Sequence, residues 1–233
     1  MAIPGCFLAM ALALPCSAAT IAYYFDGTST RSDHAASADV TVTDLTSTGV
    51  GSQIRADYGV DTPAGPTAGT SSGTIWLGTR STETGSLVPG SGDDYHSFTV
   101  TANTPGSLSL DTFVFDFVAV VENNSGNMEA LAQTYISVDG AAFSAIGSQF
   151  SASATDLADS SASHYFGPVT TASVDLSSIT SFNSVEIRVG IADNDDNNKK
   201  AQFMQGFQLT TIPEPSTALL GGLGALLLLR RRR

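Results

Sequence analysis

The stretch SLSLDTFVFDFVAVV, residues 107–121, decides the fold that the sequence predicts. Successive side chains of a β-strand point to opposite faces of its sheet. From residue 113 to 121 both faces are apolar except at Asp116: Phe113, Phe115, Phe117, Ala119 and Val121 on one side, and Val114, Asp116, Val118 and Val120 on the other. We therefore expect a strand that is buried on both faces, or nearly so.

Shorter stretches with the same alternation occur on both sides of this one. HSFTV, VEIRVGIA and FMQGFQLT each place apolar residues on one side of a strand: His96, Phe98 and Val100; Val185, Ile187, Val189 and Ile191; Phe203, Phe207 and Leu209. In TYISVDGAAFSAIG, the pair Asp139-Gly140 suits a two-residue hairpin turn, which needs positive φ angles. Many short strands and no long helical period predict an all-β chain, an antiparallel β-sandwich with jelly-roll-like topology.

Length and charge limit the organisation of the chain and its partners. With 233 residues, 42% of them hydrophobic, the chain can bury one sizeable core, which favours a single domain. Four of the ten basic residues are the last four of the chain, whereas all 22 acidic residues lie between Asp26 and Glu214. The acidic body repels phosphate backbones, so nucleic acid is not an expected partner.

The first residues have the pattern of an export signal. In MAIPGCFLAMALALPCSAAT an apolar run is followed by small residues, with Ser17 and Ala19 at the −3 and −1 positions of a cleavage site. We expect residues 1–19 to be a signal peptide. Cys16 leaves a lipoprotein signal as the alternative, although Pro15 disfavours it. Because both cysteines lie in this segment, the body at 20–211 contains no thiol.

The last residues combine three features in a fixed order. A Pro-Glu-Pro motif precedes an unbroken Ala, Leu and Gly run at 218–229, and four arginines end the chain: Pro213, Glu214 and Pro215, then Arg230, Arg231, Arg232 and Arg233. A helix over the apolar run would span about 18 Å, less than the ~30 Å of bilayer hydrocarbon. We expect a short transmembrane helix with the arginines in the cytoplasm and the body outside.

This tail, in a chain with an N-terminal signal, closely resembles the PEP-CTERM sorting signal found in exopolysaccharide-producing bacteria. The resemblance covers about 22 residues, 212–233, and its three ordered features make it specific. It implies that an exosortase-type membrane protease is a partner and processes the chain. It also implies export to the cell surface or extracellular matrix, with transient anchoring in the inner membrane by the C-terminal helix.

One acidic stretch suggests a cofactor. In DNDDNN, residues 193–198, Asp193, Asp195 and Asn197 alternate as the first oxygen ligands of a calcium loop do, although the rest of an EF-hand is missing. Calcium is therefore the one cofactor that the sequence suggests. The alternative is a polar hairpin turn between two strands.

Carboxylates and one aromatic residue are the other candidates for chemistry. Glycosidases need two carboxylates facing each other, and the sequence offers Asp93-Asp94, Asp116 and Glu186, with Asp116 unusual between two phenylalanines. Trp76 lies in a short apolar segment within the Gly- and Ser-rich residues 61–92. It is either a platform for stacking sugar rings or a core residue.

Two hypotheses about function follow. The first is an exported, non-enzymatic protein whose sandwich binds glycan, with extracellular polysaccharide as partner, or serves structurally. The alternative is a secreted glycan-active hydrolase or lyase on the same fold. A cleft with two carboxylates within about 10 Å favours catalysis, and a flat face with exposed aromatic residues favours binding. We assign no catalytic residue.

Overall fold

The computed structural model describes residues 19–24, 34–48, 53–55, 67–68, 76–79, 87, 94–122, 126–155, 164–193 and 200–212. Every described element is a β-strand, and the strands form two antiparallel sheets. The predicted all-β sandwich is therefore confirmed. Within these residues no helix is long and apolar enough to cross a membrane.

Sheet A is organised around one long strand, β9. Its main order is β2 (His34–Ala36), β1 (Ala19–Tyr24), β16 (Lys200–Thr211), β9 (Leu108–Glu122), β12 (His164–Phe166) and β6 (Thr67–Ala68). β13 (Thr170–Asp175) and β14 (Thr180–Phe182) also pair with β9, while β7 (Trp76–Thr79) pairs with β16 and with β5 (Gln53–Arg55). Every one of these pairings is antiparallel.

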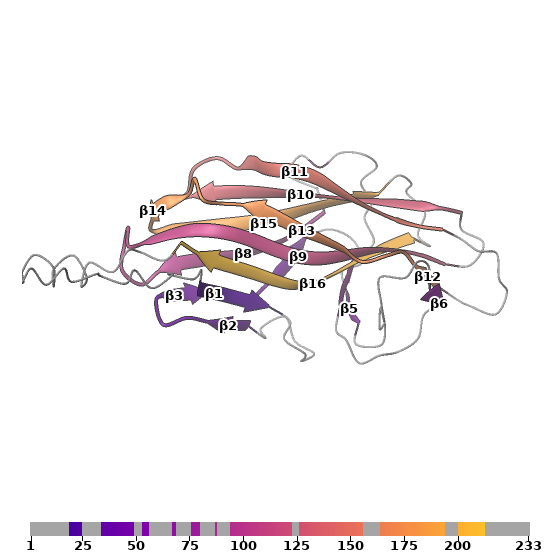
Figure 1. The fold of residues 1–233 in the computed structure, drawn as a ribbon, viewed down its shortest axis with the longest axis horizontal. Helices are drawn as coiled ribbons and strands as arrows, with labels where there is room; N and C mark the ends of the chain where they lie inside the picture. The colour runs from indigo at the N-terminus through magenta and orange to yellow at the C-terminus, as the bar shows by residue number, and fades with distance from the viewer. Residues whose placement is uncertain are drawn as a thin grey trace, which may run out of the picture.

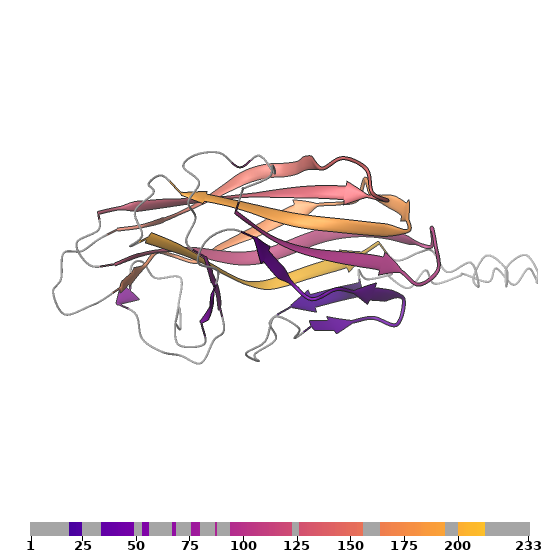
Figure 2. The ribbon, with the colours of Figure 1, turned by 180° about the vertical axis from the view of Figure 1, so that it is seen from behind.

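Sheet B covers the other side of the core. Its order is β11 (Ser144–Ala154), β10 (Met128–Val138), β15 (Ser184–Asp193), β8 (Tyr95–Ala102) and β3 (Val40–Val42), with β4 (Thr46–Thr48) also paired with β8. Figures 1 and 2 show the two layers from opposite sides, with β9 and β16 in front in the first view and β8 and β15 in front in the second.

The predicted central strand is confirmed. On β9 the predicted core series is fully buried: Phe113, Phe115, Phe117, Ala119 and Val121. On the other face Val118 and Val120 are buried, whereas Val114 and Asp116 are half-buried. The strand is thus buried on both faces along its second half only.

Aromatic side chains join the two sheets. Phe115 stacks on Phe207 of β16, with ring centroids 5.8 Å apart, and contacts Phe150 of β11 edge to face at 6.2 Å. Phe98 of β8 lies 5.8 Å from Phe113. Phe115 and Phe207 belong to sheet A, and Phe98 and Phe150 to sheet B, so these rings form one core between the sheets.

The other predicted strands are confirmed, with one change of register. The predicted inward residues of β8 and β15 are all buried: His96, Phe98 and Val100, then Val185, Ile187, Val189 and Ile191. On β16, however, Met204 lies opposite Phe117 and is buried together with Phe207, three residues later. A bulge at Gly206, whose φ is +64°, interrupts the alternation that grouped Phe203 with Phe207.

The predicted Asp139-Gly140 turn is confirmed and fastens a second segment. Both residues have positive φ, 51° and 76°, and the N–H of Ala141 donates to the carbonyl of Val138 at 3.0 Å. The Asp139 carboxylate accepts hydrogen bonds from the backbone N–H groups of Asn183 and Ser184, at 2.9 and 2.7 Å. The β10–β11 hairpin is thereby tied to the start of β15.

β15 and β16 do not pair as a hairpin. β15 ends at Asp193 and β16 begins at Lys200, but β15 pairs with β10 and β8 on its two edges and β16 lies in sheet A. The predicted polar hairpin between these strands is therefore wrong, because the chain crosses from one sheet to the other here. Residues 194–199 themselves lie outside the described part.

Candidate functional site

Alternation along three neighbouring strands builds the side of sheet B that faces away from sheet A. On β15, Val185, Ile187 and Val189 are buried in the core, so the residues between them face outward. The strand register places outward residues of β10 and β8 beside them. We call this side the outer face of sheet B. Its half-buried residues are Tyr95, Thr99, Glu186 and Arg188, and its buried residues are Ser97, Gln133, Tyr135, Ser137 and Gly190.

Arg188 packs against two aromatic rings on this face. Its Cζ atom lies 4.6 Å from the ring centroid of Tyr95 and 3.8 Å from that of Phe143, which immediately precedes β11. All three residues are half-buried. Such cation–π contacts contribute about 0.5–2 kcal/mol, more where water is excluded. They fix the plane of a side chain that would otherwise sample many rotamers.

Glu186 completes this group, which we call the Arg188 cluster: Arg188, Glu186, Tyr95 and Phe143. The Nε atom of Arg188 donates to Oε1 of Glu186 at 2.8 Å, and the two side chains are 23% and 33% exposed. A partly exposed ion pair of this kind adds at most ~1 kcal/mol to stability. Its main consequence here is geometric, since it fixes the rotation of the guanidinium within the cluster.

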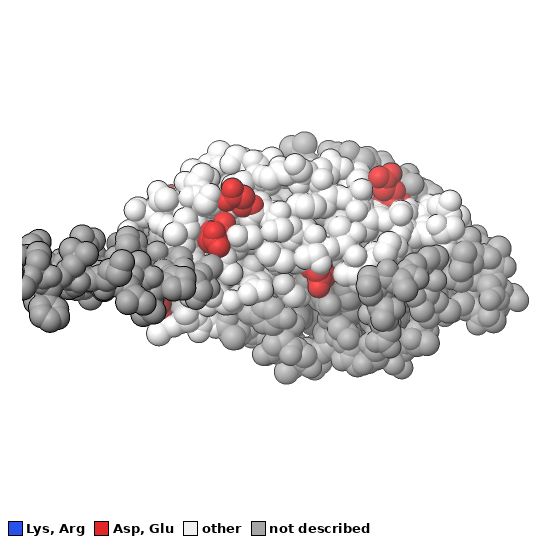
Figure 3. Space-filling view, viewed as in Figure 1, with Lys and Arg blue, Asp and Glu red and all other residues white. Residues whose placement is uncertain are grey.

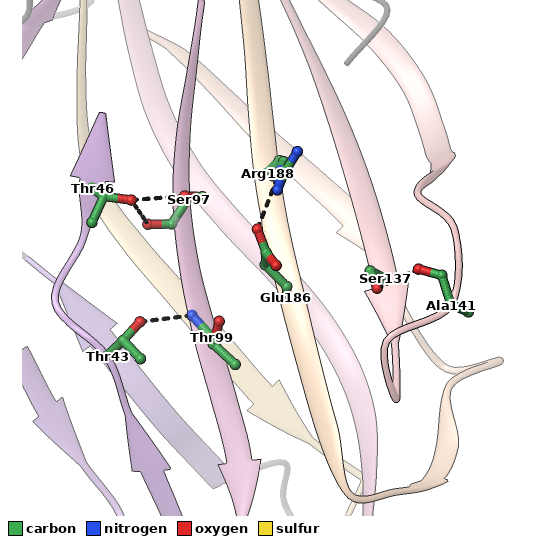
Figure 4. Close-up of polar contacts among 8 residues, drawn as sticks. All are labelled: Thr43, Thr46, Ser97, Thr99, Ser137, Ala141, Glu186 and Arg188. Carbon is green, nitrogen blue, oxygen red and sulfur yellow. Dashed lines mark hydrogen bonds and ion pairs between the residues drawn. The ribbon is translucent and has the colours of Figure 1, made fainter. Parts of the chain in front are cut away.

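Hydroxyl groups surround the cluster on the neighbouring strands (Figure 4). Thr46 Oγ1 and Ser97 Oγ lie 2.8 Å apart, and the N–H of Thr99 donates to Thr43 Oγ1 at 2.9 Å. On the other side of β15, Ser137 Oγ donates to the carbonyl of Ala141 at 2.6 Å. Hydroxyl groups therefore lie on both sides of the Arg188–Glu186 pair.

Two features of the backbone shape the surface beside the cluster. A Cβ atom at Gly190 would lie 3.3 Å from both Tyr135 Cε2 and the carbonyl oxygen of Leu87, so glycine leaves room for the Tyr135 ring. On β11 the register shifts opposite Gln133, whose Nε2 donates to the carbonyl of Ile146 at 3.0 Å. The same Nε2 also lies 3.4 Å from the carbonyl oxygen of Gly147, so this side chain bonds to the backbone of β11 at the irregularity.

The outer face of sheet A is different. Asp116 lies there, half-buried, and its Oδ1 accepts a hydrogen bond from Thr171 Oγ1 at 2.6 Å. In its described part, Figure 3 shows scattered carboxylates on this side of the molecule and no basic side chain. This face therefore offers no arrangement comparable to the Arg188 cluster within the described residues.

The candidate carboxylates are not brought together. Asp116 alternates with core residues of sheet A and Glu186 with core residues of sheet B, so the two lie on opposite outer faces. Asp94 is 1% exposed, and its carbonyl accepts a hydrogen bond from the N–H of the core residue Ile191. These three described carboxylates do not form the facing pair that glycosidase chemistry requires.

The structure places the remaining predicted site residues only in part. Trp76 begins β7, opposite Arg55 of β5, but its side chain lies outside the described part. Asp193 ends β15, whereas Asp195 and Asn197 lie outside the described residues, as does the whole of 213–233. Among the described side chains, no group of three or more His, Cys, Asp or Glu could hold a metal ion.

The Arg188 cluster was not found from the sequence. The one available signal was Arg188 itself, a cation within the alternating stretch VEIRVGIA, on the side opposite the apolar residues. Its aromatic partners come from β8 and from the end of the β10–β11 turn, so the cluster depends on strand pairing. It combines aromatic surface with charged and hydroxyl groups on an outer face, which suits ligand recognition.

No protein-family model and no curated protein matches the sequence. Among solved structures, the CBM22-1 xylan-binding domain of Paenibacillus barcinonensis Xyn10C is similar with a TM-score of 0.42 and 10% identity, over 84% of this chain and 96% of that one. TmCBM61 in complex with β-1,4-galactotriose has a TM-score of 0.34 and 10% identity, over 71% and 86%. At TM-scores this low, the similarities identify neither a family nor a ligand for this chain.

Proposed function

We propose that the chain is an exported, non-enzymatic protein whose sandwich binds extracellular glycan through the outer face of sheet B. The observation that carries the proposal is the Arg188 cluster, in which a guanidinium packed on Tyr95 and Phe143 is held by Glu186. Binding is favoured over hydrolysis because Asp116 and Glu186 lie on opposite faces.

The chemistry of sugars explains the choice of ligand. A sugar ring presents apolar C–H groups together with hydroxyls that each donate and accept a hydrogen bond. Half-buried aromatic rings can contact the C–H groups, while Arg188 and Glu186 supply donors and acceptors next to them. The acidic body, with a net charge of −12 for the whole chain, argues against nucleic acid as the alternative polymer.

The proposal is tested by native electrophoresis of the purified full chain in gels with and without polysaccharide. We expect neutral bacterial and plant polysaccharides to retard the chain relative to a non-binding reference protein, because each polymer offers many copies of the ligand. Equal mobility in all gels would show that the sandwich does not bind these glycans, and would leave a structural role.

We also propose that the tail directs sorting and that the sandwich has jelly-roll topology. The sorting proposal rests on the Pro-Glu-Pro motif, the apolar run and the terminal arginines. The topology proposal is supported by consecutive strands changing sheet, as at β8 to β9 and β15 to β16. On the sorting proposal, residues 1–19 are removed on export and an exosortase-type protease cleaves near Pro213.

Replacing Pro213 and Pro215 with Ala is expected to block processing in a host that carries an exosortase. Without the prolines, a helix can continue from the apolar run through the recognition site. A blot of membrane fractions should then show a precursor heavier than the mature form by the tail. The control replaces Thr217 with Ala, which leaves both prolines in place. If the double variant matures as the parent does, the tail is not recognised through this motif.

A further inference from the structure

We infer that the glycan bound at the Arg188 cluster is neutral, and that a pair of vicinal hydroxyls bonds to the free donor and acceptor atoms of the half-buried Arg188–Glu186 pair. This inference rests on the proposed function and specifies its ligand. The expected ligand is an uncharged sugar. The competing ligand is a polymer that contains uronic acids, because a carboxylate is the other obvious partner for an arginine.

The Arg188–Glu186 pair leaves hydrogen-bonding groups available. Within the described part of the chain, Nε of Arg188 donates to Oε1 of Glu186, and no described residue accepts a hydrogen bond from the Nη atoms. Likewise, Oε2 of Glu186 accepts none from a described residue. Two donor nitrogens and one acceptor oxygen of this half-buried pair therefore have no hydrogen-bond partner among the described residues.

A vicinal diol matches this arrangement. Each hydroxyl can accept from one group and donate to another, so one hydroxyl can accept from Nη while its neighbour donates to Oε2. The guanidinium is planar, and its contacts with Tyr95 and Phe143 already restrict its orientation. Little side-chain freedom is then left to lose on binding, which favours affinity.

The local charge selects against acidic glycans. Arg188 is the only cation described on the outer face of sheet B, and Glu186 neutralises it at 2.8 Å. Glu129, exposed on the same side of β10, adds a negative charge farther along the sheet. A uronate placed against Arg188 would therefore lie beside the carboxylate of Glu186, and like charges at such distances repel.

The test compares hydroxyethylcellulose and galactomannan with polygalacturonate and alginate, using native electrophoresis of the full chain at low and high salt. We expect retardation by at least one neutral polymer, unchanged by salt, and none by the uronates. Salt independence is expected because no net charge is neutralised on binding.

Two variants locate the effect at the pair. Arg188→Lys keeps the charge but loses the planar pair of donors, and should weaken binding to the neutral polymer by about tenfold or more. Glu186→Gln replaces the free acceptor oxygen by an amide NH2, which only donates, so binding to the neutral polymer should also weaken, by about tenfold. Thr171→Ala, on the outer face of sheet A, is the control. Melting curves establish that each variant is folded.

The outcomes separate the inference from the proposed function. Binding to uronates that weakens with salt and strengthens in Glu186→Gln would overturn the inference while glycan binding stands. An Arg188→Lys variant that binds the neutral polymer as tightly as the parent does would also overturn the inference. Absence of binding to all four polymers would overturn both.

Discussion

Replacing Phe115 with Ala is expected to lower the free energy of unfolding by about 3–5 kcal/mol, the usual cost of removing a buried phenylalanine. The side chain is 0% exposed and lies at the centre of the core between the sheets. Its ring is 5.4 Å from that of Phe113, 6.1 Å from that of Phe117 and 5.8 Å from that of Phe207. The substitution would therefore remove the ring contacts with Phe113 and Phe117 of β9 and with Phe207 of β16.

Urea unfolding followed by circular dichroism measures this effect. The matched control is Val114→Ala, one residue earlier on the same strand but half-buried on the outer face of sheet A, with an expected loss of about 1 kcal/mol. Because domains of this kind are stable by only about 5–15 kcal/mol, the Phe115→Ala midpoint should fall far below that of the control. Equal losses for the two variants would mean that Phe115 is not at the centre of the core.

The sequence predicted those parts of the fold that depend on local pattern. The burial of Phe113, Phe115 and Phe117 followed from alternation alone, because neighbouring residues of a strand must face opposite sides. The turn at Asp139-Gly140 followed from the positive φ angles that this pair tolerates. Neither prediction required knowledge of which strands pair.

The failures involve information that a single stretch does not contain. Met204, instead of Phe203, lies opposite Phe117 because Gly206 forms a bulge, and that glycine inside an alternating stretch was the overlooked sign. A hairpin turn after Asp193 was the alternative to a calcium loop, because polar residues join two strands there. Both edges of β15 are instead occupied by β10 and β8.

The candidate site shows the same limit. Trp76 and the acidic residues at 193–197 were chosen by residue type, and their side chains lie outside the described part of the chain. The Arg188 cluster brings together residues 95, 143, 186 and 188, which become neighbours only through the pairing of β15 with β8 and β10. Residue type alone could not have singled them out.

Loss of binding in a Tyr95→Ala/Phe143→Ala variant is the second large effect that we expect. Both rings contact the guanidinium of Arg188, so their removal takes away aromatic surface and also frees the arginine to move. Aromatic and arginine residues at the centre of a binding site commonly contribute about 2 kcal/mol or more each. The variant should therefore bind at least about 30-fold more weakly.

Affinity electrophoresis of the full chain, against the polysaccharide that retards the parent most, tests the central claim most directly. The matched control is Val114→Ala/Thr171→Ala, which alters the outer face of sheet A by two substitutions, and melting curves check that both double variants are folded. If the outer face of sheet B is the glycan-binding site, Tyr95→Ala/Phe143→Ala loses retardation and the control keeps it. Equal retardation of a folded Tyr95→Ala/Phe143→Ala variant and the parent would contradict the claim.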